Sequence, residues 1–217
     1  MIYKGNTRYK IYNGNGLKAI KHPSFPKFIE YLGGTGTQYI NTHITSFTNL
    51  FEIFTVLSAS SANGSSQPTF MSFFGIQCYW SASSSTFRMW SSTGGTQVSS
   101  VTMVANRKHT AYYAVTSNSQ RRMRIDFEQM KTSSGTYTSL NYPPCLFCWK
   151  SNSSPSYMPV MKVYGCRIYD NGTLIRDFHP CLSAENGHAG EPALYDVINN
   201  TYLYNEGTGT FETGPEL

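Results

Sequence analysis

The sequence has 217 residues, enough for one large β-sandwich with a sizeable core, and only 13% of them are Asp, Glu, Lys or Arg. Aromatic residues make up 15%, with 16 Tyr and 13 Phe. Aromatic side chains suit pleated strands, and Gly, Asn and Ser suit the turns between strands. The composition therefore predicts an all-β fold and excludes long helices.

The formal net charge is +5, but Lys and Arg are spread thinly along the chain. The densest group is Arg121, Arg122 and Arg124. A nucleic-acid-binding module would show a basic stripe with a recognisable Gly and aromatic spacing, and none is present. No segment approaches the roughly 20 apolar residues of a transmembrane helix. The N-terminus also lacks the basic and apolar pattern of a secretory signal, which predicts synthesis in the cytoplasm without membrane insertion.

The cysteine count is odd, which argues against a complete disulfide framework and predicts reduced thiols. Cys145-Leu-Phe-Cys148 has the spacing of half a zinc site, but no second pair completes four ligands, so no metal is expected. Cys166 alternates with apolar neighbours and is expected to be buried. The cysteines are Cys78, Cys145, Cys148, Cys166 and Cys181.

The first residues contain a short repeat, because Ile2-Tyr-Lys-Gly-Asn6 recurs as Ile11-Tyr-Asn-Gly-Asn15. Each copy pairs β-forming residues with a turn signal, which predicts a β-hairpin-like extension or, alternatively, a frayed leader. The two prolines of His22-Pro-Ser-Phe-Pro26 indicate a linker. We therefore expect residues 1–22 to be a leader segment and 23–217 to be the main domain. Helical spacing of apolar residues over 25–32 is expected to be misleading, since Pro26 lies within the segment and Gly33-Gly34 follow it.

Short strand-like runs separated by polar turns follow from Glu30 onward. The run 51–57 is apolar on both faces, which predicts a central strand. In Arg122-Met-Arg-Ile-Asp-Phe127, alternation places Met123, Ile125 and Phe127 on the core face and the charged residues in solvent. Further strands are predicted at 38–42, 71–75, 87–90 and 110–115.

The clearest hairpin lies in the C-terminal third, where Asn171-Gly172 separates strand-like residues 163–169 from 173–178. Asn-Gly readily adopts the positive φ angles of a type I′ turn, which joins antiparallel strands in two residues. Many short strands with frequent turns predict a sandwich or barrel.

Two stretches resemble concanavalin A-like, laminin G-like domains of phage and prophage proteins. Residues 30–42, Glu-Tyr-Leu-Gly-Gly-Thr-Gly-Thr-Gln-Tyr-Ile-Asn-Thr, are similar to the opening strand pair of those domains. Residues 162–180, followed by Ala193-Leu-Tyr-Asp196 and by 204–211 with its Gly-Thr-Gly turn, are similar to the closing strands. The resemblance implies an antiparallel β-sandwich of the concanavalin A-like jelly-roll type. Residues 58–160 resemble those domains only in the spacing of their short strand-like runs.

The same resemblance implies a non-enzymatic virion protein, such as a head decoration, head fibre or tail-associated module. Its expected partners are other virion proteins, host-surface or mucosal glycans, and further copies of itself in a homo-oligomer. Virion docking is expected through the N-terminal segment, with Tyr3, Lys4, Tyr12 and Asn13 as candidates. The alternatives are a bacterial or prophage-encoded carbohydrate-binding module and a divergent glycoside hydrolase.

Glycan binding uses flat aromatic rings against sugar C–H faces, and the candidate rings are Tyr79, Trp80, Trp90 and Trp149. Each could equally fill the core. Tyr79 and Trp80 are neighbours on a strand, so their side chains face opposite sides and one of the two is expected to be accessible.

Catalytic and metal chemistry finds little support in the sequence. Some jelly-roll relatives are glucanases with spaced carboxylates on one strand, and the nearest approach is Asp126-Phe-Glu128 without a third acid. His109 and His179 are expected to be structural or surface residues. Calcium could use loop carboxylates, but no dense Asp/Asn loop is present, so no cofactor is predicted. The loop carboxylates are Asp170, Asp177 and Asp196.

Overall fold

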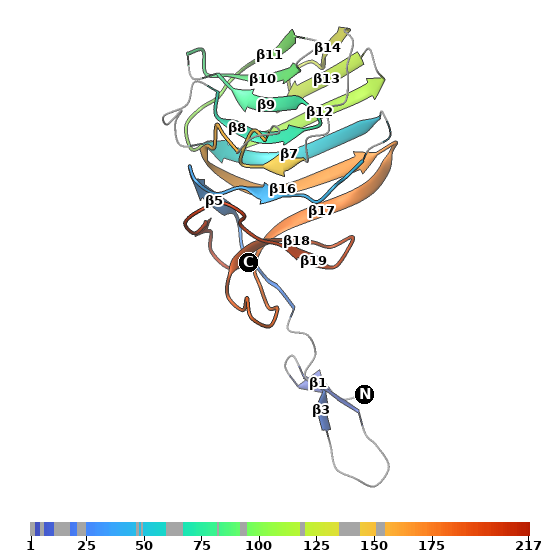
Figure 1. The fold of residues 1–217 in the computed structure, drawn as a ribbon, viewed down its shortest axis with the longest axis vertical. Coiled ribbons are helices and arrows are strands. Elements are labelled where there is room, and N and C mark those ends of the chain that lie inside the picture. Colours follow the sequence, from blue (N-terminus) through green and yellow to red (C-terminus); the bar gives the residue numbers. More distant parts are fainter. Residues whose placement is uncertain are drawn as a thin grey trace.

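The computed structural model describes residues 3–4, 7–10, 18–20, 25–46, 48, 50–59, 67–81, 83–91, 95–117, 120–134, 144–150 and 155–217. All regular secondary structure in these ranges is β-strand, and two antiparallel sheets pack as a sandwich (Figure 1). The predicted all-β sandwich is confirmed. Over the described ranges, no helix is long and apolar enough to cross a membrane.

The larger sheet has eleven strands and forms the face that carries the site. Its main path pairs β7 with β12 on one side and with β16 on the other, so β7 is central, as the sequence predicts. The path is β14 (Lys131–Ser134), β13 (Gln120–Ile125), β12 (His109–Ser117), β7 (Phe51–Ala59), β16 (Val160–Asp170), β17 (Thr173–Leu182), β18 (Pro192–Asp196) and β19 (Thr201–Leu203); β4 (Lys27–Phe28) pairs with β17, and β5 (Leu32–Thr35) pairs with β16 and β20 (Glu212–Thr213).

The smaller sheet has six strands, all antiparallel to their neighbours. Two of them, β8 and β9, are buried along their whole length, so both of their faces are covered. The order is β11 (Gly95–Thr102), β10 (Thr86–Ser91), β9 (Ile76–Trp80), β8 (Thr69–Phe73), β15 (Cys145–Leu146) and β6 (Ile40–Asn41).

Aromatic side chains from the two sheets interlock to form the core. Phe51 of β7 meets Phe73 of β8 edge to face, with ring centroids 4.5 Å apart. Tyr113 of β12 lies 5.4 Å from Phe70 of β8. Each fully buried ring of this kind contributes roughly 1.5–3 kcal/mol by leaving water. This burial fixes which face of each strand points inward and therefore which residues point out.

The β16–β17 hairpin is built as its turn sequence predicts. Asn171 and Gly172 both have positive φ, 47° and 76°, as the two central positions of a type I′ turn require. Asp170 at the end of β16 accepts a hydrogen bond from the backbone N–H of Thr48 at 3.0 Å, which ties the turn to the preceding segment.

The alternation predicted for 122–127 holds only along β13. Met123 and Ile125 are buried, but Phe127 is fully exposed, so its placement in the core is wrong. The strand ends at Ile125 and Asp126 turns the chain with a φ of 50°, so the period-two pattern no longer applies. Arg121 is buried on the same face and donates from Nη1 to Ser91 Oγ at 2.9 Å, which links the two sheets.

The N-terminal segment contains β1 (Tyr3–Lys4), β2 (Thr7–Lys10) and β3 (Lys18–Ile20), paired as a three-stranded antiparallel sheet. The strand character of the extension agrees with the sequence prediction, whereas the second copy of the repeat, residues 11–15, lies outside the described residues. Lys27–Phe28 is a strand rather than a helical turn, as expected. The division at residue 22 stays a prediction.

Candidate functional site

A straight row of side chains crosses the outer face of the larger sheet. Because side chains alternate along a strand, Phe54 of β7 faces away from the core. The pairing register sets Tyr112 of β12 opposite Phe54 and Arg124 of β13 opposite Tyr112. On the other side, Arg167 of β16 is opposite Phe54 and Asp177 of β17 is opposite Arg167. We call these five residues the aromatic row.

Small residues beside the aromatic row leave a groove. Val56 is opposite Thr110 of β12 and Gly165 of β16. A Cβ at Gly165 would meet only a backbone oxygen at 3.5 Å, an ordinary contact, so packing does not require glycine there. Because Gly165 has no side chain, the groove is deeper at this position. The groove has a volume of about 350 Å³ and is lined by Phe54, Thr55, Val56, Thr110, Ala111, Tyr112, Arg124, Asp126, Tyr164, Gly165, Cys166, Arg167, Asp177, Phe178 and His179.

Phe54 offers a fixed and accessible ring in this groove. Its side chain is 40% exposed although strands flank it on both sides. Tyr112 and Tyr169 support the ring, with centroids at 4.6 Å and 5.6 Å. Burial and a 2.9 Å hydrogen bond donated to Glu52 Oε2 raise the pKa of Tyr112 to about 12, so its hydroxyl stays protonated. The supporting rings are thus held in place while Phe54 faces solvent.

Three charged and polar side chains stand at the β17 end of the row, and we call them the Asp177 cluster. Asp177 Oδ1 lies 3.2 Å from Arg167 Nε and 3.1 Å from His179 Nε2. The side chains of Arg167 and His179 are 56% and 41% exposed. Within the described ranges Arg167 bonds Asp177 through Nε, so the edge formed by its two terminal nitrogens remains open to a ligand.

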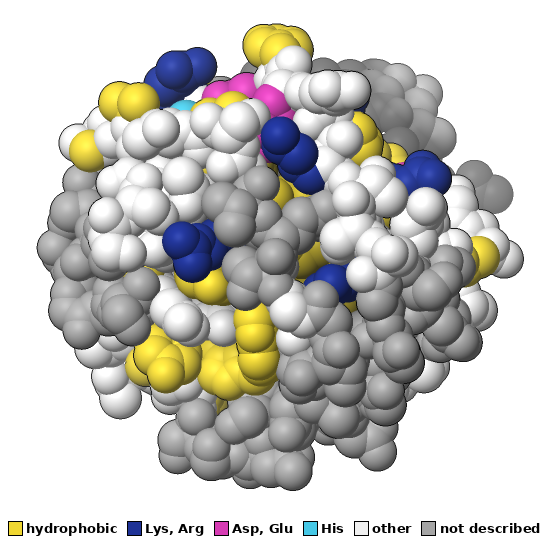
Figure 2. Space-filling model, turned by 90° about the horizontal axis from the view of Figure 1, so that it is seen from above, with side chains coloured by type: hydrophobic (Ala, Val, Ile, Leu, Met, Phe, Trp, Pro, Cys, Tyr) yellow, Lys and Arg dark blue, Asp and Glu magenta, His cyan; other side chains and the backbone are white. Residues whose placement is uncertain are grey.

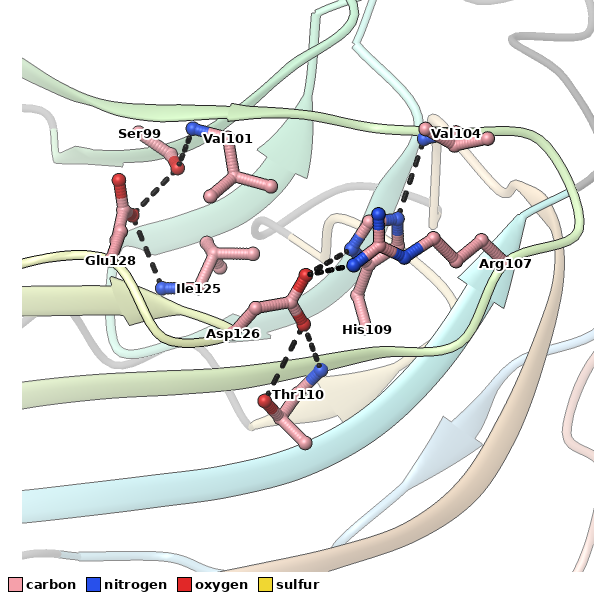
Figure 3. Close-up of polar contacts among 9 residues, drawn as sticks. All are labelled: Ser99, Val101, Val104, Arg107, His109, Thr110, Ile125, Asp126 and Glu128. Carbon is pink, nitrogen blue, oxygen red and sulfur yellow. Dashed lines mark hydrogen bonds and ion pairs between the residues drawn. The ribbon is translucent and has the colours of Figure 1, made fainter.

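A second cluster of the same residue types is drawn in Figure 3, and its Asp126 lines the groove on the β13 side, across the sheet from Asp177. In this Asp126 cluster, His109 Nδ1 lies 2.9 Å from Asp126 Oδ2, and Arg107 lies 3.6 Å from the same oxygen. The backbone N–H of Val104 donates to His109 Nε2 at 3.3 Å. Since that N–H can only donate, Nε2 carries no proton and Nδ1 donates to Asp126. Asp126 also accepts from Thr110 N at 2.9 Å.

Glu128 is occupied within the same turn. It accepts hydrogen bonds from Ser99 Oγ at 2.6 Å and from Ile125 N at 3.1 Å, and also from Ser100 (Figure 3). Burial alone raises the pKa of Glu128, but these hydrogen bonds outweigh it and hold the pKa below its usual value. Asp126 and Glu128 therefore stand on a turn beyond β13, each bound by its own partners, rather than as a carboxylate pair on one strand.

None of the sequence-predicted rings lines the groove: Tyr79 and Trp80 belong to β9, Trp90 belongs to β10, and Trp149 follows β15 in an isolated bridge with Ser156. Tyr79 and Trp80 are both buried, at 3% and 0% exposure, so the expectation that one of them is accessible is wrong. Trp80 faces the core, and the opposite face of β9 is covered as well. Trp90 and Trp149 are half-buried and meet edge to face, with centroids 5.9 Å apart.

The predicted docking residues are described only in part. Tyr3 and Lys4 form β1, of which the backbone alone is described, and Tyr12 and Asn13 lie outside the described residues. Their role stays a prediction.

The cysteines and acids form no metal site in the described part of the chain. All five cysteines are buried and none is in a disulfide, and burial raises the pKa of Cys166 to about 12. No group of three or more His, Cys, Asp or Glu residues there could hold a metal ion. The acids expected near loops lie in strands and bind other residues of the protein. Asp170 of β16 accepts a hydrogen bond from Thr48, and buried Asp196 of β18 pairs with Arg176 at 3.5 Å.

Positive charge is scattered over the end of the sandwich where β11 and β14 lie. Figure 2 views the molecule from this end, and the Lys and Arg side chains that it colours stand as separate spots rather than as a stripe. An acidic patch lies among them.

Sequence comparison finds no match, since no protein-family model and no curated protein matches the chain. Among solved structures, the chain is similar to a candidate carbohydrate-binding protein from Bacteroides ovatus, with a TM-score of 0.58 and 10% identity over 88% of this chain. The match spans 62% of that protein. At this identity the likeness shows the fold alone.

Two glutamic peptidases also align with the chain. SCP-B, a member of the eqolisin family solved with a tripeptide, has a TM-score of 0.38 at 14% identity, covering 86% of this chain and 99% of its own. Scytalido-glutamic peptidase has a TM-score of 0.41 at 12% identity, covering 87% and 100%. These scores are too low to support an argument about activity.

Proposed function

We propose that the protein is a carbohydrate-binding module that holds a saccharide in the groove of the larger sheet. The observation that carries the proposal is the exposed Phe54 ring, supported by two tyrosines and flanked by polar side chains. A sugar ring has apolar C–H faces and hydroxyl edges, so it needs a flat apolar platform with hydrogen-bonding groups around it. The similarity to a candidate carbohydrate-binding protein supports the same function.

A single exposed aromatic residue is ordinary on a protein surface and needs no function. Phe54 differs because it lies inside a groove whose low floor contains a glycine that packing does not require. Arg167, Asp177 and His179 supply donors and acceptors within the same groove. Platform, hollow and polar rim therefore coincide at one place.

The direct test is binding by isothermal titration calorimetry to a panel of soluble neutral and acidic polysaccharides. Phe54→Ala removes the platform and should abolish binding. Gly165→Leu fills the floor and should also abolish it. Phe127→Ala is the control, because it removes another exposed phenylalanine ring, one that lies on a turn outside the groove. Unchanged binding by Phe54→Ala and Gly165→Leu would contradict the proposed location.

The module is proposed to bind without cleaving its ligand. Asp126 and Glu128 are both held by their own partners, which supports this part of the proposal. Release of reducing sugar from a bound polysaccharide would contradict it, and the Asp126→Ala, Glu128→Ala double variant would show whether these acids are responsible.

We further propose that the module is part of a phage particle, and this proposal rests on the sequence resemblance alone. A glycan-binding module facing outward from a particle would serve adhesion, with residues 1–22 as the attachment segment. Deleting residues 1–22 tests this, since normal incorporation of the truncated protein into particles would exclude a docking role.

A further inference from the structure

The two ends of the groove differ in how their arginines are used. Arg124 is exposed, lines the groove and has no carboxylate within ion-pair distance in the described part of the chain. Arg167 is paired through Nε with Asp177, which leaves its terminal nitrogens facing solvent. A guanidinium edge of this kind matches an oxyanion with two parallel hydrogen bonds.

The carboxylates around the groove already have partners. Asp126 is held by His109 and Thr110 and lies near Arg107. Asp177 accepts from Arg167 and lies next to His179. Glu52, on the same outer face, accepts a hydrogen bond from the hydroxyl of Tyr112. The charged groups of the groove that remain available to a ligand are therefore positive.

Building on the proposed carbohydrate-binding function, we propose that the saccharide is acidic, with carboxylate or sulfate groups that pair with Arg124 and Arg167. The register places these two residues in one row, three strand spacings apart. At ~4.8 Å per spacing, their Cα atoms are separated by about 14 Å across the sheet. That span exceeds one sugar ring, so the ligand is an oligosaccharide whose middle unit lies on Phe54 and whose charged units reach the two arginines.

The sharpest probe is a pair of ligands that differ only in charge. Oligogalacturonate carries a carboxylate on each unit, and its fully methyl-esterified form is neutral. We expect the acid to bind at least about tenfold more tightly than the ester, since hydrogen bonds to charged groups contribute about 1.5–3 kcal/mol. Monomeric galacturonate should bind far more weakly than the oligomer. Sulfated dextran against plain dextran tests sulfate as the alternative source of the charge.

Variants of the two arginines test the assignment to this groove. Arg124→Gln and Arg167→Gln should each weaken oligogalacturonate binding about tenfold and should weaken binding of the methyl ester by a clearly smaller factor, since the ester loses no charged partner. Asp177→Asn removes a competing negative charge and should strengthen acid binding. Lys27→Gln is the matched control, because it removes one exposed positive charge outside the groove and should change affinity less than about twofold.

The possible outcomes separate this inference from the proposed function. If neutral saccharides bind as well as acidic ones, and Phe54→Ala abolishes that binding, the acidic ligand is wrong and the groove function stands. If Lys27→Gln weakens acid binding as much as the groove variants do, the attraction is diffuse and the inference is overturned. If no polysaccharide in either class binds, the proposed function itself falls. Both arginines are exposed, so matching thermal unfolding of the variants would confirm that folding is intact.

Discussion

The Asp126 and Asp177 clusters are built from the same three residue types and behave in opposite ways. In the first, the His109 side chain is fully buried and both ring nitrogens have partners, one of them a backbone N–H. In the second, His179 is 41% exposed and Arg167 keeps an edge toward solvent. An Arg, an Asp and a His in contact therefore do not define a role. Burial and the number of satisfied atoms separate a structural clamp from a surface that can receive a ligand.

The largest expected effect is the loss of the buried histidine. His109→Ala should destabilise the fold by about 2–4 kcal/mol, because it leaves a cavity beside Phe87 and removes hydrogen-bond partners from Asp126 and Val104. Urea unfolding followed by tryptophan fluorescence measures this. If the free energy of unfolding fell by less than about 0.5 kcal/mol, the Asp126 cluster would not hold the turn, and it would not differ from the Asp177 cluster in the way described above.

Glu128 should give an intermediate effect with a definite pH dependence. Glu128→Gln should cost about 1 kcal/mol at neutral pH, since an amide replaces a carboxylate that accepts several hydrogen bonds. The folded-state pKa of Glu128 lies below its usual 4.5, so the carboxylate stabilises the fold above that pH and the contribution is lost as the pH falls through the folded-state pKa. Unfolding curves should therefore converge for wild type and variant on acidification. A difference in the free energy of unfolding that stayed constant down to about pH 3 would contradict this role of Glu128.

The smallest expected effect comes from a substitution in the Asp177 cluster. His179→Ala should change the free energy of unfolding by less than about 0.5 kcal/mol, because the His179 side chain is 41% exposed and water weakens its contact with Asp177. The same urea titration measures it beside His109→Ala. A loss as large as that of the buried histidine would mean that the Asp177 cluster is also structural, which would weaken the proposal that it serves a ligand.

Much of the fold follows from local chemistry that is readable in the sequence. Asn171-Gly172 predicts its hairpin because few other pairs accept two positive φ angles. The double-sided apolar pattern of 51–57 predicts a central strand. By contrast, β11 and β14 consist largely of Gly, Ser, Thr, Gln and Lys and lie at sheet edges, where little burial marks them as strands. Alternation places Phe127 in the core wrongly, because the pattern carries no sign that the strand ends at Ile125.

The groove was harder to predict than the fold. Phe54, Tyr112, Arg124 and Arg167 become neighbours only through the register of four strands, and register depends on packing between segments distant in sequence. Trp offers the largest flat face to a sugar, so composition alone favours Tyr79-Trp80 over a single Phe on a central strand. One sequence signal was present: a Phe on the second face of a central strand, where a polar residue is more common.

Strand β16 has one further consequence. It pairs with β7 from far along the chain, as the hydrogen bond from Thr55 to the Gly165 carbonyl across 110 positions shows. Closing so large a loop costs entropy before any contact rewards it, so folding is expected to be slow. Short peptides taken from one strand should carry none of the proposed binding surface. A nascent chain would complete that surface only after residue 179 had been made, late in its synthesis.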